Sequence, residues 1–164
     1  MLSDTHGRDD ARLEGAALAS VDAADVVVHA GDFTTAAVVS AFEATSERLV
    51  AVHGNVDEAA VKERLPATAT LDVGGRRLVV VHGHEHDETA RALLGRQEGA
   101  DVVVSGHSHR AAVVDAGDAT LLNPGSHAEP RGGRKTHAEL EPVGGQLRGR
   151  IVDVDGTTVE SFVA

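Results

Sequence analysis

The sequence contains no cysteine, no tryptophan and no tyrosine, and only three of its 164 residues are phenylalanine. Without cysteine the protein has neither disulfides nor thiolate ligands, so a transition-metal site would use imidazole, carboxylate or amide groups. Lysine is nearly absent too, with two lysines (Lys62 and Lys135) among 15 basic residues. No apolar run approaches the roughly 18 residues that a membrane helix needs, and no charged-then-apolar leader opens the chain. We therefore expect a soluble, cytoplasmic protein without a membrane partner.

The chain is strongly acidic and rich in histidine. It has 26 acidic residues, a formal net charge of −11 and ten histidines. This charge argues against a nucleic-acid groove or an anionic membrane surface as the main partner. An acidic composition poor in lysine is typical of a protein from a halophilic archaeon. The codon bias of a GC-rich genome is the alternative explanation of this composition. A length of 164 residues fits a single domain, 1–164.

The first two thirds of the chain alternate short apolar runs with segments of helical length. Continuous β-branched runs of this kind are typical of strands covered on both faces. The expected strands are residues 25–30, 48–53, 78–81 and 101–105. The expected helices are residues 9–20, 34–44, 57–64 and 87–97, with Asp9 or Asp10 and Thr34 or Thr35 as caps of the first two. The alternation predicts parallel βα units.

The last third reads as an antiparallel meander. Strand-like segments lie at residues 111–115, 120–123, 136–141, 146–154 and 157–163. Hairpin connections are expected at Gly74-Gly75, Gly144-Gly145 and Asp155-Gly156. A second sheet packed on the first and flanked by helices accommodates both halves, so we expect an α/β fold of the two-sheet αββα sandwich type.

Metal-ligating residue types follow the expected strands. They occur in Asp4-Thr5-His6-Gly7, Gly31-Asp32, Gly54-Asn55-Val56-Asp57, His82-Gly83-His84 and Gly106-His107-Ser108-His109. The carboxyl ends of parallel strands meet at one edge of a sheet, where ligands of open α/β sheets collect, so these residues should converge in space. A single Asp after a strand is more often a helix cap, but capping does not explain the whole set. Asp, His and Asn suit Mn²⁺, Zn²⁺, Fe²⁺ or Ni²⁺.

These motifs, in this order, resemble those of the calcineurin-like metallophosphoesterases. The most similar branch is the small bacterial and archaeal one of YfcE-like phosphodiesterases. Asn123-Pro124-Gly125-Ser126, followed by Pro130-Arg131, also resembles the late active-site loop of that branch. The resemblance covers residues 3 to about 131. It is specific for the superfamily and much less specific for the substrate.

The resemblance implies seven metal ligands that form two adjoining sites. The first site would use Asp4, His6 and His109. The second site would use Asn55, His82 and His107. Asp32 would bridge the two ions, because a carboxylate offers two oxygens. The cofactors implied are two divalent ions, with Mn²⁺ favoured over Ni²⁺, Zn²⁺, Fe²⁺ or Mg²⁺.

The activity implied is hydrolysis of phosphodiesters or small phosphomonoesters by a metal-bound hydroxide. Asp32, Asn55 and His82 are the residues expected to support catalysis directly. Two divalent ions would also offset the repulsion between an acidic protein and an anionic substrate. The expected partner is therefore a small phosphoester.

Other residues near the motifs have weaker expectations. We expect His29 and His53 to be packed, and for His84 a structural and a functional role are equally supported. The remaining histidines of this group are expected to face solvent: His86, His127 and His137. Three arginines adjoin motifs and are expected to be solvated, with phosphate binding as the alternative: Arg8, Arg110 and Arg131.

The sequence departs from the family pattern in two places. Many relatives carry a histidine where Val56 stands, and valine cannot protonate a leaving group. Relatives also place an apolar strand before the first motif, where this chain has only Met1 and Leu2. We expect this first strand to be truncated and the cellular protein to be several residues longer. Both departures keep an alternative open, a weakly active or inactive metal-binding scaffold that binds a protein partner. An exposed strand edge would favour a homodimer.

Overall fold

The structure is a computed structural model that describes residues 1–164. Its four helices are α1 (Gly15–Ala23), α2 (Ala36–Thr45), α3 (Ala59–Arg64) and α4 (Glu88–Glu98). The strands of the first half are β1 (Val27–His29), β2 (Leu49–Ala51), β3 (Thr68–Val73), β4 (Arg76–Val81) and β5 (Val102–Val104). The strands of the second half are β6 (Ala112–Asp115), β7 (Thr120–Asn123), β8 (Thr136–Val143), β9 (Gln146–Asp153) and β10 (Thr158–Val163). The expected α/β class is confirmed.

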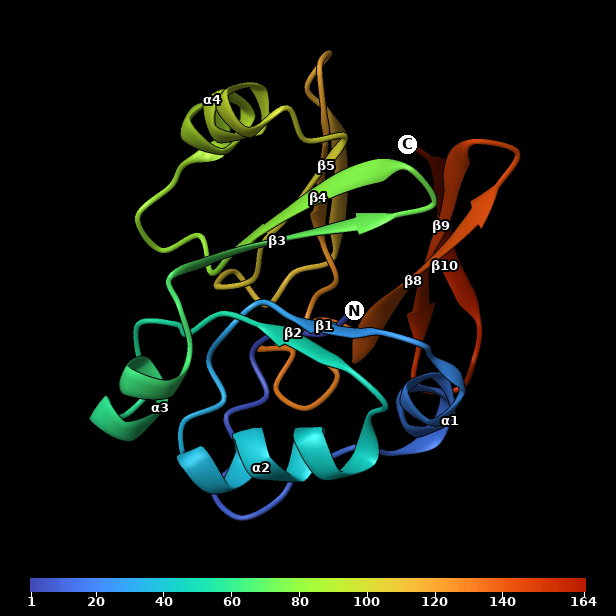
Figure 1. Ribbon diagram of the computed structural model, residues 1–164. Helices are drawn as coiled ribbons and strands as arrows, with labels where there is room; N and C mark the ends of the chain where they lie inside the picture. The colour runs from blue at the N-terminus through green and yellow to red at the C-terminus, as the bar shows by residue number, and fades with distance from the viewer.

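The strands form three hydrogen-bonded sheets. β1 and β2 pair in parallel, five strands follow the order β3-β4-β5-β7-β6, and three follow the order β10-β9-β8. Figure 1 shows α4 over the outer face of the five-stranded sheet, with α1 and α2 on the opposite side of the molecule. The strands lie between these helices, which is the layer order α, β, β, α.

The core consists of three apolar clusters that match these layers. One cluster lies between the sheets and includes Val28, Leu122 and Ile151. A second joins β1 and β2 to the first three helices and contains Phe33 and Phe42. The third joins the five-stranded sheet to α4. With almost no aromatic residues, short aliphatic side chains fill the interior, and these suit strands buried on both faces.

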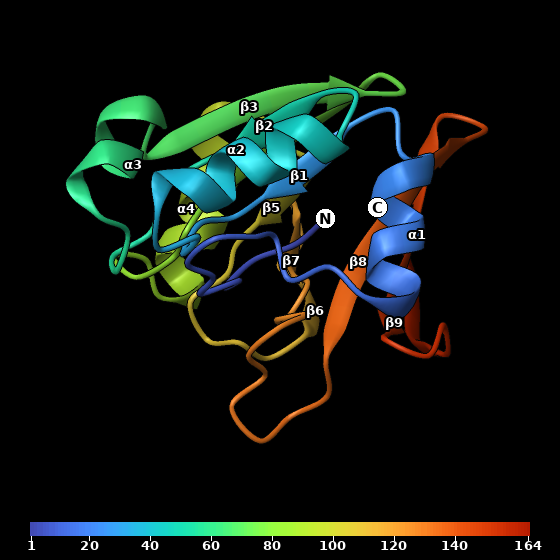
Figure 2. The same ribbon diagram turned by 90° about the horizontal axis from the view of Figure 1, so that it is seen from below.

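Met1 and Leu2, the two residues before Ser3, pair with strands on both sides. The N–H of Leu2 donates to the carbonyl of Val28 at 2.8 Å, and the N–H of Ala30 donates to the carbonyl of Leu2 at 2.9 Å. On the other side, Met1 and Ala138 exchange two hydrogen bonds, of 2.6 Å and 3.0 Å. Figures 1 and 2 both place the amino terminus between β1 and β8. Two residues thus connect the two-stranded and three-stranded sheets.

Helix α4 follows the sequence expectation and α1 does not. Asp87 caps α4 by accepting a hydrogen bond from the N–H of Ala90 at 2.8 Å. Residues 9–14 are not helical, because Asp10 instead accepts from the N–H of Arg12, and Arg12 and Gly15 both have positive φ. The expected Asp cap of the first helix is therefore wrong.

Helices α2 and α3 begin slightly later than expected. Thr35 occupies the N-cap position of α2, but its hydroxyl donates to the carbonyl of Arg8 and makes no capping bond. Helix α3 begins at Ala59, two residues after the expected start, and the carboxylate of Asp57 accepts hydrogen bonds from the N–H groups of Thr34 and Gly54.

The expected late meander is only partly correct. Strands β8, β9 and β10 form the antiparallel meander, and the three expected hairpin connections are confirmed. Strands β6 and β7 instead belong to the five-stranded sheet, where β7 pairs in parallel with β5. Leu121 and Leu122 are both buried, and this two-sided burial suits an interior strand. None of the four helices is long and apolar enough to cross a membrane.

Candidate metal centre

The loops that carry the motifs adopt an unusual backbone. Five of the seven expected ligands have left-handed φ values between 46° and 68°. They are Asp4, His6, Asp32, His107 and His109. A non-glycine residue in this region costs about 1–3 kcal/mol, and such strain concentrates at functional sites. The fold therefore holds these side chains in orientations that an unstrained backbone would not give.

The first group of ligands lies around Asp4. The Nε2 atoms of His6 and His109 are 3.1 Å apart, and the Nε2 atom of His109 lies 3.4 Å from Asp4 Oδ1. The second ring nitrogen of His109 donates to the carbonyl of Glu129, which leaves Nε2 to face the carboxylate. All three side chains could offer a ligand atom to one ion.

The second group lies around His82. Its Nε2 atom is 3.1 Å from both Asp32 Oδ2 and Asn55 Oδ1, and its Nδ1 atom donates to the carbonyl of Ala30 at 2.7 Å. The Nδ1 atom of His107 lies 3.2 Å from the same Asn55 oxygen. The structure thus brings together the four residues expected at this site.

Asp32 lies between the two groups. Its Oδ2 atom is 3.1 Å from His82 Nε2 and 3.7 Å from His6 Nε2. Its other oxygen accepts the N–H of Val56 at 3.1 Å. Asp4, Asp32 and His82 can also offer ligand atoms to one ion, so the two groups adjoin.

The chemistry of these side chains fits a divalent metal. Asp4 Oδ2 is buried and has no hydrogen-bond partner, and an unpartnered buried carboxylate oxygen is costly unless a cation neutralises it. His82 and His109 each donate Nδ1–H to a backbone carbonyl, which directs the Nε2 electron pair into the centre. This arrangement is typical of metal-ligating histidine.

Burial and mutual charge shift the pKa values of the centre. Burial raises the pKa of Asp4 and lowers that of His6. For the Asp32–His82 pair, burial opposes the charged form of both groups. Their hydrogen bond and opposite charges outweigh it, so the pKa of Asp32 is lowered and that of His82 is raised. Protons and a cation therefore compete for the same atoms.

Sequence reasoning assigned no role to Asp57, although its carboxylate fixes two motif loops. It accepts hydrogen bonds from the backbone N–H groups of Asp32, Thr34 and Gly54 at 3.2, 2.6 and 2.7 Å. The late loop supports the first motif in a similar way, because the hydroxyl of Ser126 donates to the carbonyl of Asp4 at 2.7 Å. In the sequence, the only signal for Asp57 and Ser126 was their position within two of the motifs.

Arg12 was also missed. Its guanidinium donates to the carbonyl of Thr5 at 3.0 Å, to that of His6 at 3.4 Å and to that of Ala128 at 3.4 Å. It also lies 3.6 Å from the carboxylate of Glu129. One side chain thus ties the His6 loop to the loop whose Glu129 carbonyl orients His109.

Three of the remaining histidines are buried structural residues. His29 is packed as expected, against Phe33 with ring centroids 3.8 Å apart, and it bonds the hydroxyl of Thr5 at 2.8 Å. The expectation that His127 and His137 face solvent is wrong, because both are 2% exposed. The ring of His127 donates to the carbonyl of Ala11 beneath α2, and that of His137 packs on α1.

The residues at the rim of the centre are more accessible. His84 is exposed, and its ring centroid is 5.4 Å from that of His82 and 6.3 Å from that of His107. Val56 is 45% exposed. The structure leaves the three arginines near the motifs exposed, as expected: Arg8, Arg110 and Arg131. His53 and His86 are partly buried.

A layered α/β fold that gathers these residues at its strand ends holds a candidate centre for divalent metal ions. The chain belongs to the calcineurin-like phosphoesterase superfamily, because the family model described as "Calcineurin-like phosphoesterase superfamily domain" matches residues 1–143. This family resemblance was expected from the motifs and is confirmed.

Two curated relatives and one solved structure illustrate the similarity. "Probable metallophosphoesterase MJ0623" of Methanocaldococcus jannaschii is 31% identical over 160 residues, covering 94% of this chain and 80% of that protein. "Phosphodiesterase MJ0936" of the same organism is 24% identical over 136 residues, with 76% and 81% covered. The zinc complex of Vps29 from Entamoeba histolytica superposes with a TM-score of 0.77 at 20% identity, covering 99% and 96%. The protein is thus a metal-dependent hydrolase acting on phosphoester bonds, and its family implies divalent metal ions.

Proposed function

We propose that the protein is a dimetal phosphodiesterase that acts on small phosphodiesters, with Mn²⁺ as the favoured metal. The observation that carries the proposal is the position of Asp32, whose carboxylate faces His6 at 3.7 Å and His82 at 3.1 Å. One carboxylate shared by two adjoining ligand groups suits a pair of ions. Two ions close together can stabilise both the attacking and the leaving oxygen of a phosphoester.

Seven residues would hold the two ions. The first ion would be held by Asp4, His6 and His109, and the second by Asn55, His82 and His107, with Asp32 between them. When bound, the ions would supply Lewis-acid activation of water and neutralise the charge of the phosphate.

Apart from binding the ions, the residues of the chain would mainly hold the motif loops in place and would transfer no proton at position 56. Asp57 and Arg12 keep the motif loops in register through backbone hydrogen bonds. Val56 stands at the exposed rim, where it can neither donate nor accept a proton. A phosphodiester with a good leaving group therefore suits this centre better than an alkyl monoester.

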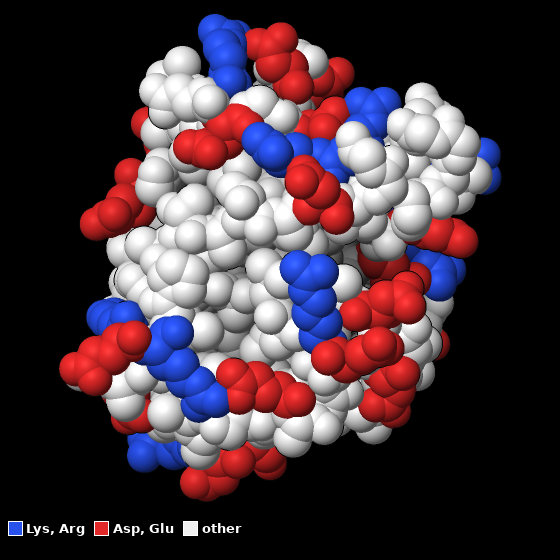
Figure 3. Space-filling view, in the orientation of Figure 1, with Lys and Arg blue, Asp and Glu red and all other residues white.

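The proposed substrate is small. On the face shown in Figure 3, acidic and basic side chains are interspersed around an uncharged central area. The net charge of −11 supports a small phosphoester over a nucleic-acid strand. A cytoplasmic location and a homodimer remain predictions.

The metal content of variants tests the dimetal proposal. Asp32→Ala is expected to lower the content of both ions after dialysis against Mn²⁺. The control is Asp118→Ala, because Asp118 pairs with Arg96 on the surface at 2.8 Å. Two ions per chain retained by Asp32→Ala would contradict the bridging role.

The second candidate function is a metal-binding scaffold for a protein partner. Val56 favours it, since the centre has no proton donor at that position. The similarity to Vps29 supports it only at the level of the fold, because the identity is 20%. Two bound metals without hydrolysis of any phosphoester would favour this candidate.

A further inference from the structure

A small polar pocket adjoins the metal centre. We call it the arginine pocket, because Arg110 and Arg134 both line it. Its volume is about 240 Å³, and two of its seven lining residues are hydrophobic. His109 lines it as well, and the Nε2 atom of the same residue lies 3.4 Å from Asp4 Oδ1 in the centre. One residue thus belongs to both the arginine pocket and the proposed first metal site.

Two loops carry the arginines of the pocket. Arg110 directly follows His109, and Arg134 lies in the loop between β7 and β8, which Figure 2 shows at the edge of the molecule. Within this loop the N–H of Gly133 donates to the carbonyl of Pro130 at 2.9 Å, and φ is positive at both residues between them. These are features of a type I′ turn. A hydrogen-bonded turn therefore directly precedes Arg134 and limits the positions that its backbone can take.

The guanidinium groups supply free hydrogen-bond donors to the pocket. The hydroxyl of Thr136, which also lines it, already donates to a backbone carbonyl at 2.8 Å. Arg110 bonds the hydroxyl of Ser108 through its backbone, at 3.3 and 3.4 Å, and its guanidinium pairs with no carboxylate. Arg134 lies 3.6 Å from the carboxylate of Asp153, and its side chain is 69% exposed. Because a guanidinium has five N–H donors, both arginines keep donors for a ligand.

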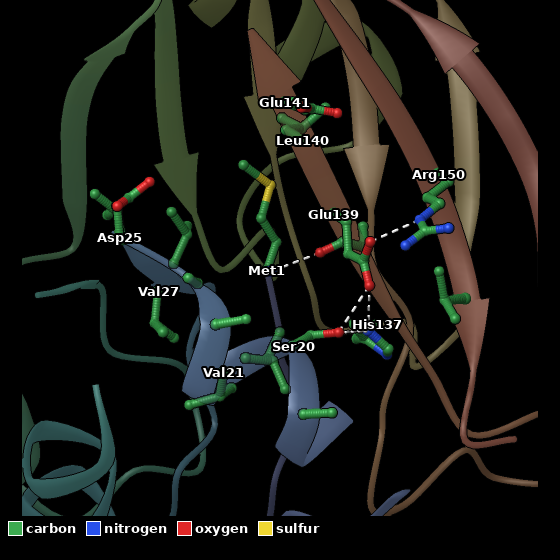
Figure 4. Close-up of a pocket in the computed structure, with 18 of the residues that line it drawn as sticks. Met1, Ser20, Val21, Asp25, Val27, His137, Glu139, Leu140, Glu141 and Arg150 are labelled. Carbon is green, nitrogen blue, oxygen red and sulfur yellow. Dashed lines mark hydrogen bonds and ion pairs between the residues drawn. The ribbon is translucent and has the colours of Figure 1, made fainter. Parts of the chain in front are cut away.

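Local positive charge distinguishes the arginine pocket from the rest of this acidic chain. Residues 130–136 contain three basic and no acidic residues, although the net charge of the chain is −11. Several arginines elsewhere face a carboxylate at short range. Arg150, for example, lies 2.6 Å from Glu139, as Figure 4 shows. The unpaired guanidinium of Arg110 beside a basic loop therefore suits an anionic group.

We propose that Arg110 and Arg134 bind a second phosphate group of the substrate, one that is not hydrolysed. The favoured substrates are then small phosphodiesters that carry a further phosphate on one of the two esterified groups. A guanidinium suits this group, because its planar fork of N–H donors can bond two phosphate oxygens at once. The inference rests on the proposed phosphodiesterase function, in which the metal centre holds the diester itself.

The kinetic test compares 4-nitrophenyl phenyl phosphate with the same diester carrying a phosphonomethyl group on its phenyl ring. In the Mn²⁺-loaded protein we expect a KM at least about tenfold lower for the phosphonate diester, as for a hydrogen bond to a charged group. Arg110→Gln and Arg134→Gln should each remove most of this preference. The control is Arg148→Gln, because Arg148 is exposed on β9 outside the pocket, and this variant should keep the preference. Equal KM values for the two diesters in the unmodified protein would overturn the proposal.

A binding test separates the pocket from the activity of the metal centre. Phenylphosphonate is titrated into the Mg²⁺-loaded protein, and the Nε–H signals of its arginines are followed by NMR. We expect saturable shifts for Arg110 and Arg134 and none for Arg148. Arg110→Gln should weaken the affinity measured at Arg134 at least about tenfold. Shifts that do not saturate, or that are equal at all three arginines, would overturn the proposal. If neither diester is hydrolysed, the phosphodiesterase function fails, and this titration decides on the pocket by itself.

Discussion

The Nε2 atoms of His6 and His109 lie 3.1 Å apart, although 103 positions separate the two residues along the chain. Burial lowers the pKa of His6, and a second protonated ring at this distance would be repelled. The Nδ1 atom of His109 is already bonded to the Glu129 carbonyl. The two Nε2 atoms thus face the same point, beside the buried carboxylate of Asp4, and a cation there could bind all three side chains.

Arg12→Ala should weaken the first metal site selectively. The substitution removes the link between the His6 carbonyl and the loop that orients His109. Loss of an outer hydrogen-bond partner typically costs about 10-fold or more in metal affinity. In a calorimetric Mn²⁺ titration we expect one of two binding steps to weaken by about that factor.

The matched control for Arg12 is Arg64. Its guanidinium pairs with Glu43 away from the centre, and its side chain is 37% exposed against 40% for Arg12. Arg64→Ala should leave both binding steps unchanged. Equal weakening of both steps by Arg12→Ala would show a general loss of stability instead of a positioning effect.

Val56→His should help poor leaving groups more than good ones. An imidazole at this exposed rim position can protonate a leaving oxygen, and its backbone N–H can still donate to Asp32. General acid catalysis typically contributes about 10²–10⁴-fold, so we expect at least a tenfold gain for an alkyl phosphodiester. Hydrolysis of a nitrophenyl ester should change little. The control, Val56→Gln, adds polarity without a titrating proton, and an equal gain in that variant would contradict the proton-donor explanation.

The protein should lose stability as the pH falls from about 6.5 to 4. Burial lowers the pKa of His127 to about 4, and burial also holds that of His29 well below its ordinary value. The unfolded chain binds these protons at higher pH than the folded chain, so acid favours unfolding. For His127 alone, a shift of that size corresponds to about 3 kcal/mol.

Denaturant unfolding with a chelator present at several pH values measures this loss. His127→Gln keeps an amide that can donate to the Ala11 carbonyl, and it does not titrate. The difference in unfolding free energy between pH 6.5 and 4 should therefore shrink in the variant. An unchanged difference would show that His127 is not the titrating group.

The sequence predicts the clustering of the centre well, because its signals are local. The motifs are two to four residues long, and all but the first follow an expected apolar strand. Parallel strands bring such ends together. Asp4, Asn55 and His107 could therefore be grouped without a structure. The left-handed backbone of these loops could not be foreseen, because most of the residues that adopt it are not glycine.

Residues that act through long-range contacts escaped prediction. Arg12 bonds the carbonyl of Ala128, which is 116 positions away, and no pattern in the sequence relates the two. His127 and His137 were expected to face solvent, but α2 and α1 cover them. Strand β7 was assigned to the wrong sheet, because a short apolar run does not identify its neighbours.

The most direct test of the proposed phosphodiesterase activity compares the hydrolysis of a chromogenic phosphodiester with that of the matching monoester. Both are measured in high salt, with Mn²⁺ added and then chelated. We expect diester turnover that stops on chelation, returns with Mn²⁺ and exceeds monoester turnover. Turnover that persists through chelation would contradict a metal-dependent centre. Two tightly bound ions without hydrolysis of either ester would contradict the proposed phosphodiesterase and favour the scaffold.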